Sequence, residues 1–154
     1  MARLDDGSVV GIQALLHWNH SHTGPLSHQR CIELTARIGL MAPLGQWMLH
    51  GACAQLTSWR QLLGEVTPLL HVALTAQQSH DPDLVAGIVS ALEQTGLAAE
   101  SVQLGVPVSA LDAEPDETED NLRVLADMGI SIALLGFRGV ADFAYLEELP
   151  VWTV

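Results

Sequence analysis

Hydrophobic positions along the chain alternate between short continuous runs, typical of buried strands, and longer stretches with the three-to-four-residue spacing of amphipathic helices. The charge-poor runs predict five strands, at residues 9–16, 69–74, 102–108, 130–135 and 151–154. The periodic stretches predict helices at 27–39, 44–63, 81–95, 117–128 and 141–149. Strands that alternate with helices pair in parallel through right-handed crossovers, which predicts an α/β sheet or barrel.

Local residue types sharpen some of these elements. Ser27 is expected to cap the first helix, and Gly96 to end the third in a left-handed conformation. Asp81 is expected at an N-cap, with Pro82 at the first helical position. Residues 19–26 are predicted to form a loop. The helix at 44–63 is expected to bury one apolar stripe, formed by Trp47, Met48, Ala52, Leu56 and Trp59.

The number of strands limits the choice of fold. An eight-stranded β/α barrel typically needs about 250 residues, whereas this chain has 154 residues. The sequence therefore predicts either an open sheet or a barrel that lacks some of its elements.

Charge and composition exclude several classes of protein. The chain has 6 basic residues, all Arg and scattered singly, against 18 acidic ones, so its net charge is −12. Binding to nucleic acid through phosphate neutralisation is not expected. The longest apolar run, 130–137, is too short to span a membrane. Residues 1–8 do not resemble a secretory leader, so Cys31 and Cys53 are expected to be reduced and buried, in a cytoplasmic protein.

Hydrophobic residues make up 49% of the chain, and the mean hydropathy is +0.27. Small domains bury a smaller share of their surface than large ones. Some apolar surface is therefore expected to contact a partner.

Four collinear stretches resemble the EAL domain, the phosphodiesterase family that cleaves the bacterial second messenger cyclic di-GMP. They are DGSVVGIQALLHWNHSHTGPLS (6–27), GLMAPLGQWMLHGACAQLTSW (39–59), TAQQSHDPDLVAGIVSALEQTGL (75–97) and IALLGFRGVADFAYLEELPVWTV (132–154). The resemblance implies an incomplete TIM-like (β/α) barrel with about five parallel strands. It also implies that residues 1–154 form a single truncated domain, without the family's first strand and the C-terminal third of its barrel.

The positions that match the family's metal ligands and catalytic groups carry other residues here. Gln13 replaces the Glu of the EAL triplet, Ala73 an Asn, Gly105 and Val108 two Glu, and Leu135 and Gly136 two Asp. The family's catalytic Lys would follow Trp152, and the sequence contains no Lys. Two-metal hydrolysis of a phosphodiester needs several carboxylates and a positioned base. We therefore expect no enzyme activity, no metal and no cofactor.

The resemblance and the open sheet together favour a regulatory or signalling module that acts through protein–protein contact. An unpaired parallel edge must be covered or paired, so we expect a protein partner or self-association into an oligomer. Trp152, in the last strand, is a candidate interface residue. Inactive EAL-like domains that regulate other proteins support this reading by resemblance.

Two alternative functions remain open. The chain is a cyclic di-GMP or nucleotide receptor if Gln13, His17 and Trp18, which match the family's ligand-contacting motif, still hold the ligand. It is instead a fragment of a longer cyclic di-GMP signalling protein if the missing elements belong to the same polypeptide.

Two further clusters have both a functional and an ordinary interpretation. His17, His20, His22 and His28 could ligate a transition metal, or could belong to an exposed loop without four converging ligands. Residues 112–120 include six acidic residues, which could dock a basic partner. The favoured interpretation is a solvated loop leading into a helix, with its charges near the positive end of the helix dipole.

Overall fold

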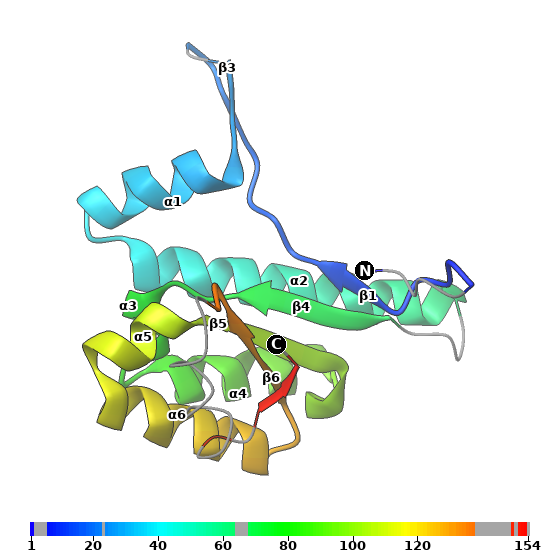
Figure 1. Cartoon of the computed structure of the whole chain (residues 1–154). Helices are drawn as coiled ribbons and strands as arrows, with labels where there is room; N and C mark the ends of the chain where they lie inside the picture. The colour runs from blue at the N-terminus through cyan, green and yellow to red at the C-terminus, as the bar shows by residue number, and fades with distance from the viewer. Residues whose placement is uncertain (2–5, 23, 64–67, 138–148, 150, 154) are drawn as a thin grey trace.

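Five parallel strands form one sheet in the computed structural model of the chain, which describes residues 1, 6–22, 24–63, 68–137, 149 and 151–153 (Figure 1). The spatial order is β1 (Gly11–Gln13), β4 (Leu69–Ala73), β5 (Val102–Pro107), β6 (Ser131–Leu135) and β7 (Val151–Thr153). The predicted α/β fold with about five parallel strands is confirmed. The first strand is only three residues long, shorter than the apolar run that predicted it.

The helices are α1 (His28–Arg37), α2 (Met41–Leu63), α3 (Ala76–Ser79), α4 (Leu84–Thr95), α5 (Val108–Ala113) and α6 (Pro115–Asp127), with a 3₁₀ turn at Ala99–Ser101. The long helix α2 contacts α4, which contacts α6, and α2 and α6 also contact sheet strands. In contrast, α1 and an antiparallel hairpin of β2 (Trp18–His20) and β3 (Gly24–Leu26) extend away from the sheet (Figure 1). Residues 19–26 therefore form most of a hairpin, not the predicted loop.

The helix ends show where local sequence signals succeed. Ser27 caps α1 by accepting a hydrogen bond from the Arg30 backbone N–H, and Gly96 ends α4 with φ of 64°. Asp81 is not an N-cap, because α4 begins at Leu84. Its carboxylate instead accepts from the Asp83 backbone N–H, 2.9 Å away, in an Asx turn before the helix.

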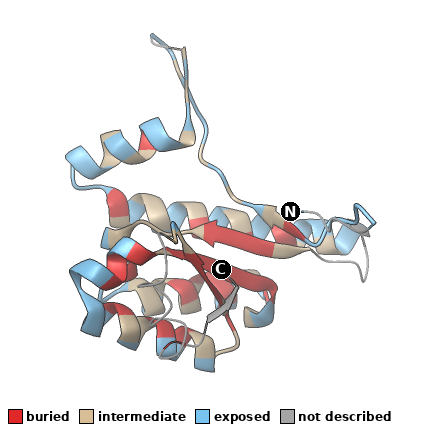
Figure 2. Ribbon diagram, in the orientation of Figure 1, coloured by how far each residue is buried: buried red, intermediate tan, exposed pale blue. Residues whose placement is uncertain are grey.

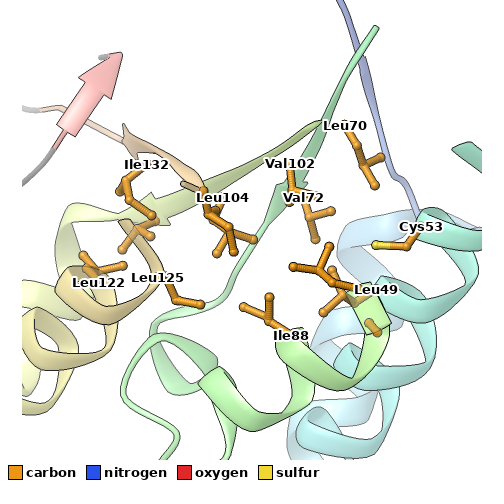
Figure 3. Close-up of a cluster of buried hydrophobic side chains, with 14 of the residues drawn as sticks. Leu49, Cys53, Leu70, Val72, Ile88, Val102, Leu104, Leu122, Leu125 and Ile132 are labelled. Atoms are coloured by element: carbon orange, nitrogen blue, oxygen red, sulfur yellow. The ribbon is translucent and has the colours of Figure 1, made fainter. Parts of the chain in front are cut away.

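The core lies between the sheet and the helix layer that contains α2, α4 and α6 (Figure 3). Side chains alternate along each strand, so Leu70 and Val72 of β4 and Leu104 of β5 point to this layer. They meet Ile88 of α4 and Leu125 of α6, which are also fully buried. Burial is concentrated in this half of the molecule, whereas α1 and the hairpin are mostly exposed (Figure 2).

The buried face of α2 agrees with the predicted stripe in part, because Leu56 is fully buried and Met48 and Ala52 pack against the core. Met41, Leu49, Cys53 and Leu56 face the core, whereas Trp47 is 66% and Trp59 38% exposed. Both faces of this helix are apolar, because its 23 residues include one charged side chain, Arg60. Periodicity could therefore not decide which face is buried, and the sequence analysis wrongly placed both tryptophans in the core.

The acidic stretch 112–120 is mostly helical. It ends α5 and begins α6, in which Pro115 occupies the first turn and Asp116 and Glu117 lie near the positive end of the helix dipole. The predicted solvated loop is wrong, although most of the acidic side chains are exposed. The structure has no helix in its described part that is long and apolar enough to cross a membrane. The helix predicted at 141–149 falls outside the described residues except for Leu149.

Both cysteines are free and buried, and burial raises the pKa of the Cys53 thiol from 9.0 to about 11. The unfolded chain loses this proton near pH 9, whereas the folded chain keeps it to about pH 11. The contribution of this pKa difference to the free energy of unfolding is therefore fully present below about pH 9. Between about pH 9 and pH 11 the free energy of unfolding falls by about 1.4 kcal/mol per pH unit. In urea titrations at increasing pH, the stability of the parent relative to Cys53→Ala should fall across this window. If the free energies of unfolding of the parent and of Cys53→Ala changed with pH in the same way, the raised pKa would be contradicted.

Candidate functional site

The carboxyl ends of the parallel strands meet at one edge of the sheet, where α/β proteins usually bind ligands. Ala73, Gly105 and Ala133 are direct neighbours across β4, β5 and β6 there. Gln13 ends β1 and Leu135 ends β6, while Val108 begins α5 and Gly136 follows β6 with φ of 76°. The positions that the sequence analysis singled out are therefore brought to one edge, and they present an amide, apolar groups and glycine backbone.

A row of polar side chains crosses the sheet from the carboxyl end of β1 to the amino end of β6. His71, Gln103 and Ser131 are successive cross-strand neighbours on the face opposite the helix layer, and Gln13, at the end of the edge strand β1, is the partner of His71 in the register. His71 donates from Nδ1 to Gln103 Oε1 at 3.1 Å, and both side chains are only 7% exposed. Sequence reasoning missed this pair. The polar positions that interrupt the apolar runs LLHVAL and VQLGV are the signal that could have found it.

Close packing of His71 explains the glycine at position 105. An added Cβ on Gly105 would lie 2.8 Å from both Cε1 and Nε2 of His71, and 2.7 Å from Leu135 Cδ1. Distances below about 3 Å are essentially absent between such atoms, so this position has no room for a side chain unless its neighbours shift. The imidazole thus occupies the space that a residue at position 105 would need.

The donor groups that the structure describes at this edge do not fit the divalent cations that the family resemblance implied. Such cations favour carboxylate and carbonyl oxygens. Among the described residues, no group of three or more His, Cys, Asp or Glu side chains is placed to hold a metal ion. Two of the four clustered histidines accept hydrogen bonds from backbone N–H groups. His28 Nδ1 accepts from the Leu16 N–H at 3.1 Å, and His20 Nδ1 accepts from the His22 N–H at 3.2 Å.

Two hollows beside β1, α1 and α2 share lining residues and form one concave surface, which we name the aromatic groove. The first, of about 370 Å³, lies between β1 and α2 and is lined by Trp47 and Trp59. The second, of about 410 Å³, lies between α1 and α2 and is lined by Trp18 and Ile38. Leu16, His17 and Trp47 line both hollows.

The aromatic groove brings together the three residues predicted to contact a ligand. Gln13 and His17 line the first hollow, and His17 and Trp18 line the second. Trp18 is 50% exposed and meets the His20 ring edge-on, with centroids 4.8 Å apart. Trp152, predicted at an interface, lies in β7, but its side chain is outside the described part of the structure.

Charge is divided unevenly along the sequence. Residues 81–154 contain two Arg and fourteen acidic residues (2 − 14 = −12). Residues 1–80, which include all residues that line the aromatic groove, contain four Arg, four acidic residues (4 − 4 = 0) and all seven His. An anionic ligand or partner at the groove therefore meets far less negative charge than the net value of −12 indicates.

Comparison with known proteins reveals relatives along nearly the whole chain. An uncharacterised protein of Mycobacterium tuberculosis is 33% identical over 150 residues, covering 97% of this chain and 49% of that protein. The cyclic di-GMP phosphodiesterase NbdA of Pseudomonas aeruginosa is 35% identical over 149 residues, covering 96% of this chain and 19% of that protein. The chain thus spans about half the length of the first relative and less of the second.

A solved structure of the PaMucR phosphodiesterase in complex with c-di-GMP has a similar fold. It superposes with a TM-score of 0.84 at 28% sequence identity, covering 94% of this chain and 59% of that chain. This likeness supports the prediction of an incomplete TIM-like barrel.

These relatives correct one sequence-based prediction. We expected that the chain is not an enzyme, from the residues at the strand ends. The prediction is wrong, because NbdA and PaMucR, 35% and 28% identical to this chain, are phosphodiesterases. Residue replacements read from one sequence, without measured activity, did not justify excluding the family's reaction.

The family assignment rests on sequence and on fold together. The family model described as EAL domain matches residues 1–154, which is the entire chain. The parallel β/α arrangement agrees with the PaMucR structure over 94% of the chain. Both findings agree with the resemblance in the four collinear stretches, and the chain therefore belongs to the EAL domain family.

Proposed function

We propose that this chain is part of a cyclic di-GMP signalling protein and acts through protein contact at the aromatic groove. One observation carries the proposal. Eleven large hydrophobic side chains are exposed in the described part of the structure, and nine of them lie between Val9 and Leu62. Five of these nine line the two hollows, namely Leu15, Trp18, Ile38, Trp47 and Trp59, so more than half of this apolar surface belongs to the groove. A concentrated apolar surface of this kind marks an interaction site.

The residue types favour a protein as the occupant. Trp47 and Trp59 flank the first hollow, and tryptophan is enriched among the residues that dominate the energy of protein interfaces. Among the residues that the structure describes, no Asp, Glu or Arg lines either hollow, and the centres of such interfaces are also depleted of charge. The extent of the domain is part of the same proposal: residues 1–154 supply one portion of an EAL barrel.

The test produces the chain in a bacterium that carries a fluorescent reporter of cyclic di-GMP. Trp47→Ala should abolish the reporter response to the parent chain, because truncating a central interface tryptophan typically costs about 2 kcal/mol or more of binding free energy. Val124→Ala is the matched control, since Val124 is also exposed, at 46%, but lies on α6. A full response from Trp47→Ala would contradict protein contact at the groove.

Binding of cyclic di-GMP itself is the second candidate function. It is favoured by the PaMucR complex with c-di-GMP, and by the way the groove gathers Gln13, His17 and Trp18. The groove also belongs to the part of the chain, residues 1–80, that has a formal charge of 0, so a dianionic ligand meets little repulsion there.

Calorimetric titration of the purified chain with cyclic di-GMP tests this candidate. Saturable heat should weaken about tenfold in Gln13→Ala if the amide contacts the ligand, which corresponds to the loss of about 1.4 kcal/mol. Gln61→Ala, at an exposed position near the end of α2, should bind like the parent. The same samples, with Mg²⁺ added, should be assayed for the linear dinucleotide, because hydrolysis is the activity named for the relatives. Absence of heat would leave protein contact as the function of the groove.

A further inference from the structure

A second concave surface lies between α2 and α4, on the face of α2 that is turned toward α4. It consists of a small hollow of about 40 Å³ and a broad hollow of about 440 Å³. Gln46, Asp83 and Gly87 line both hollows, so the two form one continuous surface, which we name the polar cleft. Its chemistry differs from that of the aromatic groove, because amides and carboxylates take the place of the tryptophans.

The small hollow contains an amide donor without a partner. Gln78 lines this hollow and is only 7% exposed. Its Oε1 accepts hydrogen bonds from the backbone N–H and the hydroxyl of Thr75, each at 2.9 Å. No acceptor among the described residues meets its Nε2. A buried donor that stays unpaired is unfavourable, so an acceptor atom of a ligand would be bound here with a gain in free energy.

Neighbouring residues hold this amide in a fixed direction. A Cβ added to Gly45 of α2 would overlap Gln78 Nε2, so the glycine makes room for the amide. Thr75 fixes the oxygen end of the same side chain through a capping box at the start of α3. The donor is therefore positioned before any ligand arrives, as in most small binding sites.

Two carboxylates stand at the same hollow. Asp81 and Asp83 line it, and the exposed Asp83 carboxylate forms no hydrogen bond or ion pair with any residue that the structure describes. Residues 81–154 carry a net charge of −12, and the whole sequence contains no Lys. Of the described residues, no Arg lines either hollow of the polar cleft. A cationic group of a ligand therefore meets negative charge that the chain itself leaves unpaired.

The broad hollow continues the surface with hydrogen-bonding groups and a low floor. His50 Nε2 donates to Gln94 Oε1 at 3.0 Å, and Gln94 Nε2 donates to Ser90 Oγ at 2.8 Å, so these side chains form one row. Ala86 and Gly87 also line this hollow, and their small size leaves room above the surface of α4. An extended segment of polypeptide fits such a shallow, polar surface.

We propose that the polar cleft binds a basic peptide segment of a partner protein. A Lys or Arg side chain of this segment pairs with Asp81 and Asp83 through charge-assisted hydrogen bonds, and a backbone carbonyl of the segment accepts from Gln78 Nε2. A polyamine fits less well, because it supplies positive charge but no acceptor for the amide. The inference goes beyond the proposed function, since the polar cleft is a second surface that contains no tryptophan.

The experiment measures the fluorescence anisotropy of a fluorescein-labelled arginine–alanine heptapeptide as the full chain is added. We expect saturable binding that weakens with added salt. Asp83→Asn should weaken the binding about tenfold, the loss typical of one charged hydrogen bond. Asp127→Asn is the matched control, because it makes the same change of charge at an exposed position of α6 that lines neither hollow. It should change the affinity by less than about twofold.

Nuclear magnetic resonance of the side-chain amides tests the second contact. The Nε2 resonances of Gln78 should shift as the unlabelled peptide is added. Those of Gln61, which is exposed near the end of α2, should stay in place. Spermidine added at the same concentration of positive charge should leave the Gln78 resonances unchanged, because it cannot accept a hydrogen bond from the amide.

Each other outcome overturns the inference in a recognisable way. Absence of saturable binding removes the peptide from the polar cleft. Equal losses in Asp83→Asn and Asp127→Asn would reveal a general attraction to an acidic surface, and equal responses to peptide and spermidine would make a polyamine the ligand. Circular dichroism of both asparagine variants separates these results from loss of folding. The reporter assay with Trp47→Ala tests the aromatic groove separately, so either proposal can fail without the other.

Discussion

Leu56→Ala is expected to lower the free energy of unfolding by about 2–5 kcal/mol, the usual range for a leucine deleted from a packed core. Leu56 of α2 is fully buried between the helix and the sheet. Its truncation removes three carbon atoms from that contact and leaves a cavity, because the surrounding structure relaxes only in part. In urea unfolding, the midpoint should shift strongly while the slope stays constant.

The same helix provides the matched control. Leu62 is 79% exposed, so Leu62→Ala makes the same chemical change with little loss of buried surface. It should alter the free energy of unfolding by less than about 0.5 kcal/mol. Equal effects of the two substitutions would contradict the burial of Leu56 against the sheet and the exposure of Leu62.

This pair of leucines also shows why the sequence predicted the fold better than the helix faces. Strand positions follow from charge-poor runs flanked by turns, and four of the five predicted strands agree closely in position with β4, β5, β6 and β7. The helix α2 carries apolar residues on all sides, so periodicity leaves its orientation undetermined. The orientation is fixed by tertiary packing against the sheet, which no local pattern contains.

The candidate site was predictable only in part for a related reason. Strand alternation brings Gln13, Ala73 and Gly105 to one edge of the sheet, as the sequence analysis implied by resemblance. The contact of His71 with Gly105 depends on the register between β4 and β5. The groove depends on the direction of α1 relative to α2. Neither the register nor the helix direction can be read from residue spacing.

Gly105→Ala is expected to destabilise the chain by about 1–3 kcal/mol, the usual cost of adding a methyl group to a closed site. The new Cβ would lie 2.8 Å from the His71 ring and 2.7 Å from Leu135 Cδ1. Of these two neighbours, His71 is the more confined, because it is 93% buried and hydrogen-bonded to Gln103.

A double-mutant cycle isolates this contact. If the His71 ring is what excludes a side chain at position 105, Gly105→Ala should cost clearly less in the His71→Ala background, with a coupling of about 0.5–3 kcal/mol. Gly51→Ala is the matched glycine control: its added methyl meets open space, so it should stabilise the helix by up to about 1 kcal/mol. Additive effects in the cycle would place the obstacle at Leu135 instead. Strong coupling would mean that a side chain at position 105 requires a smaller residue at position 71. Both positions would then have to be substituted together to place a side chain at this edge of the sheet.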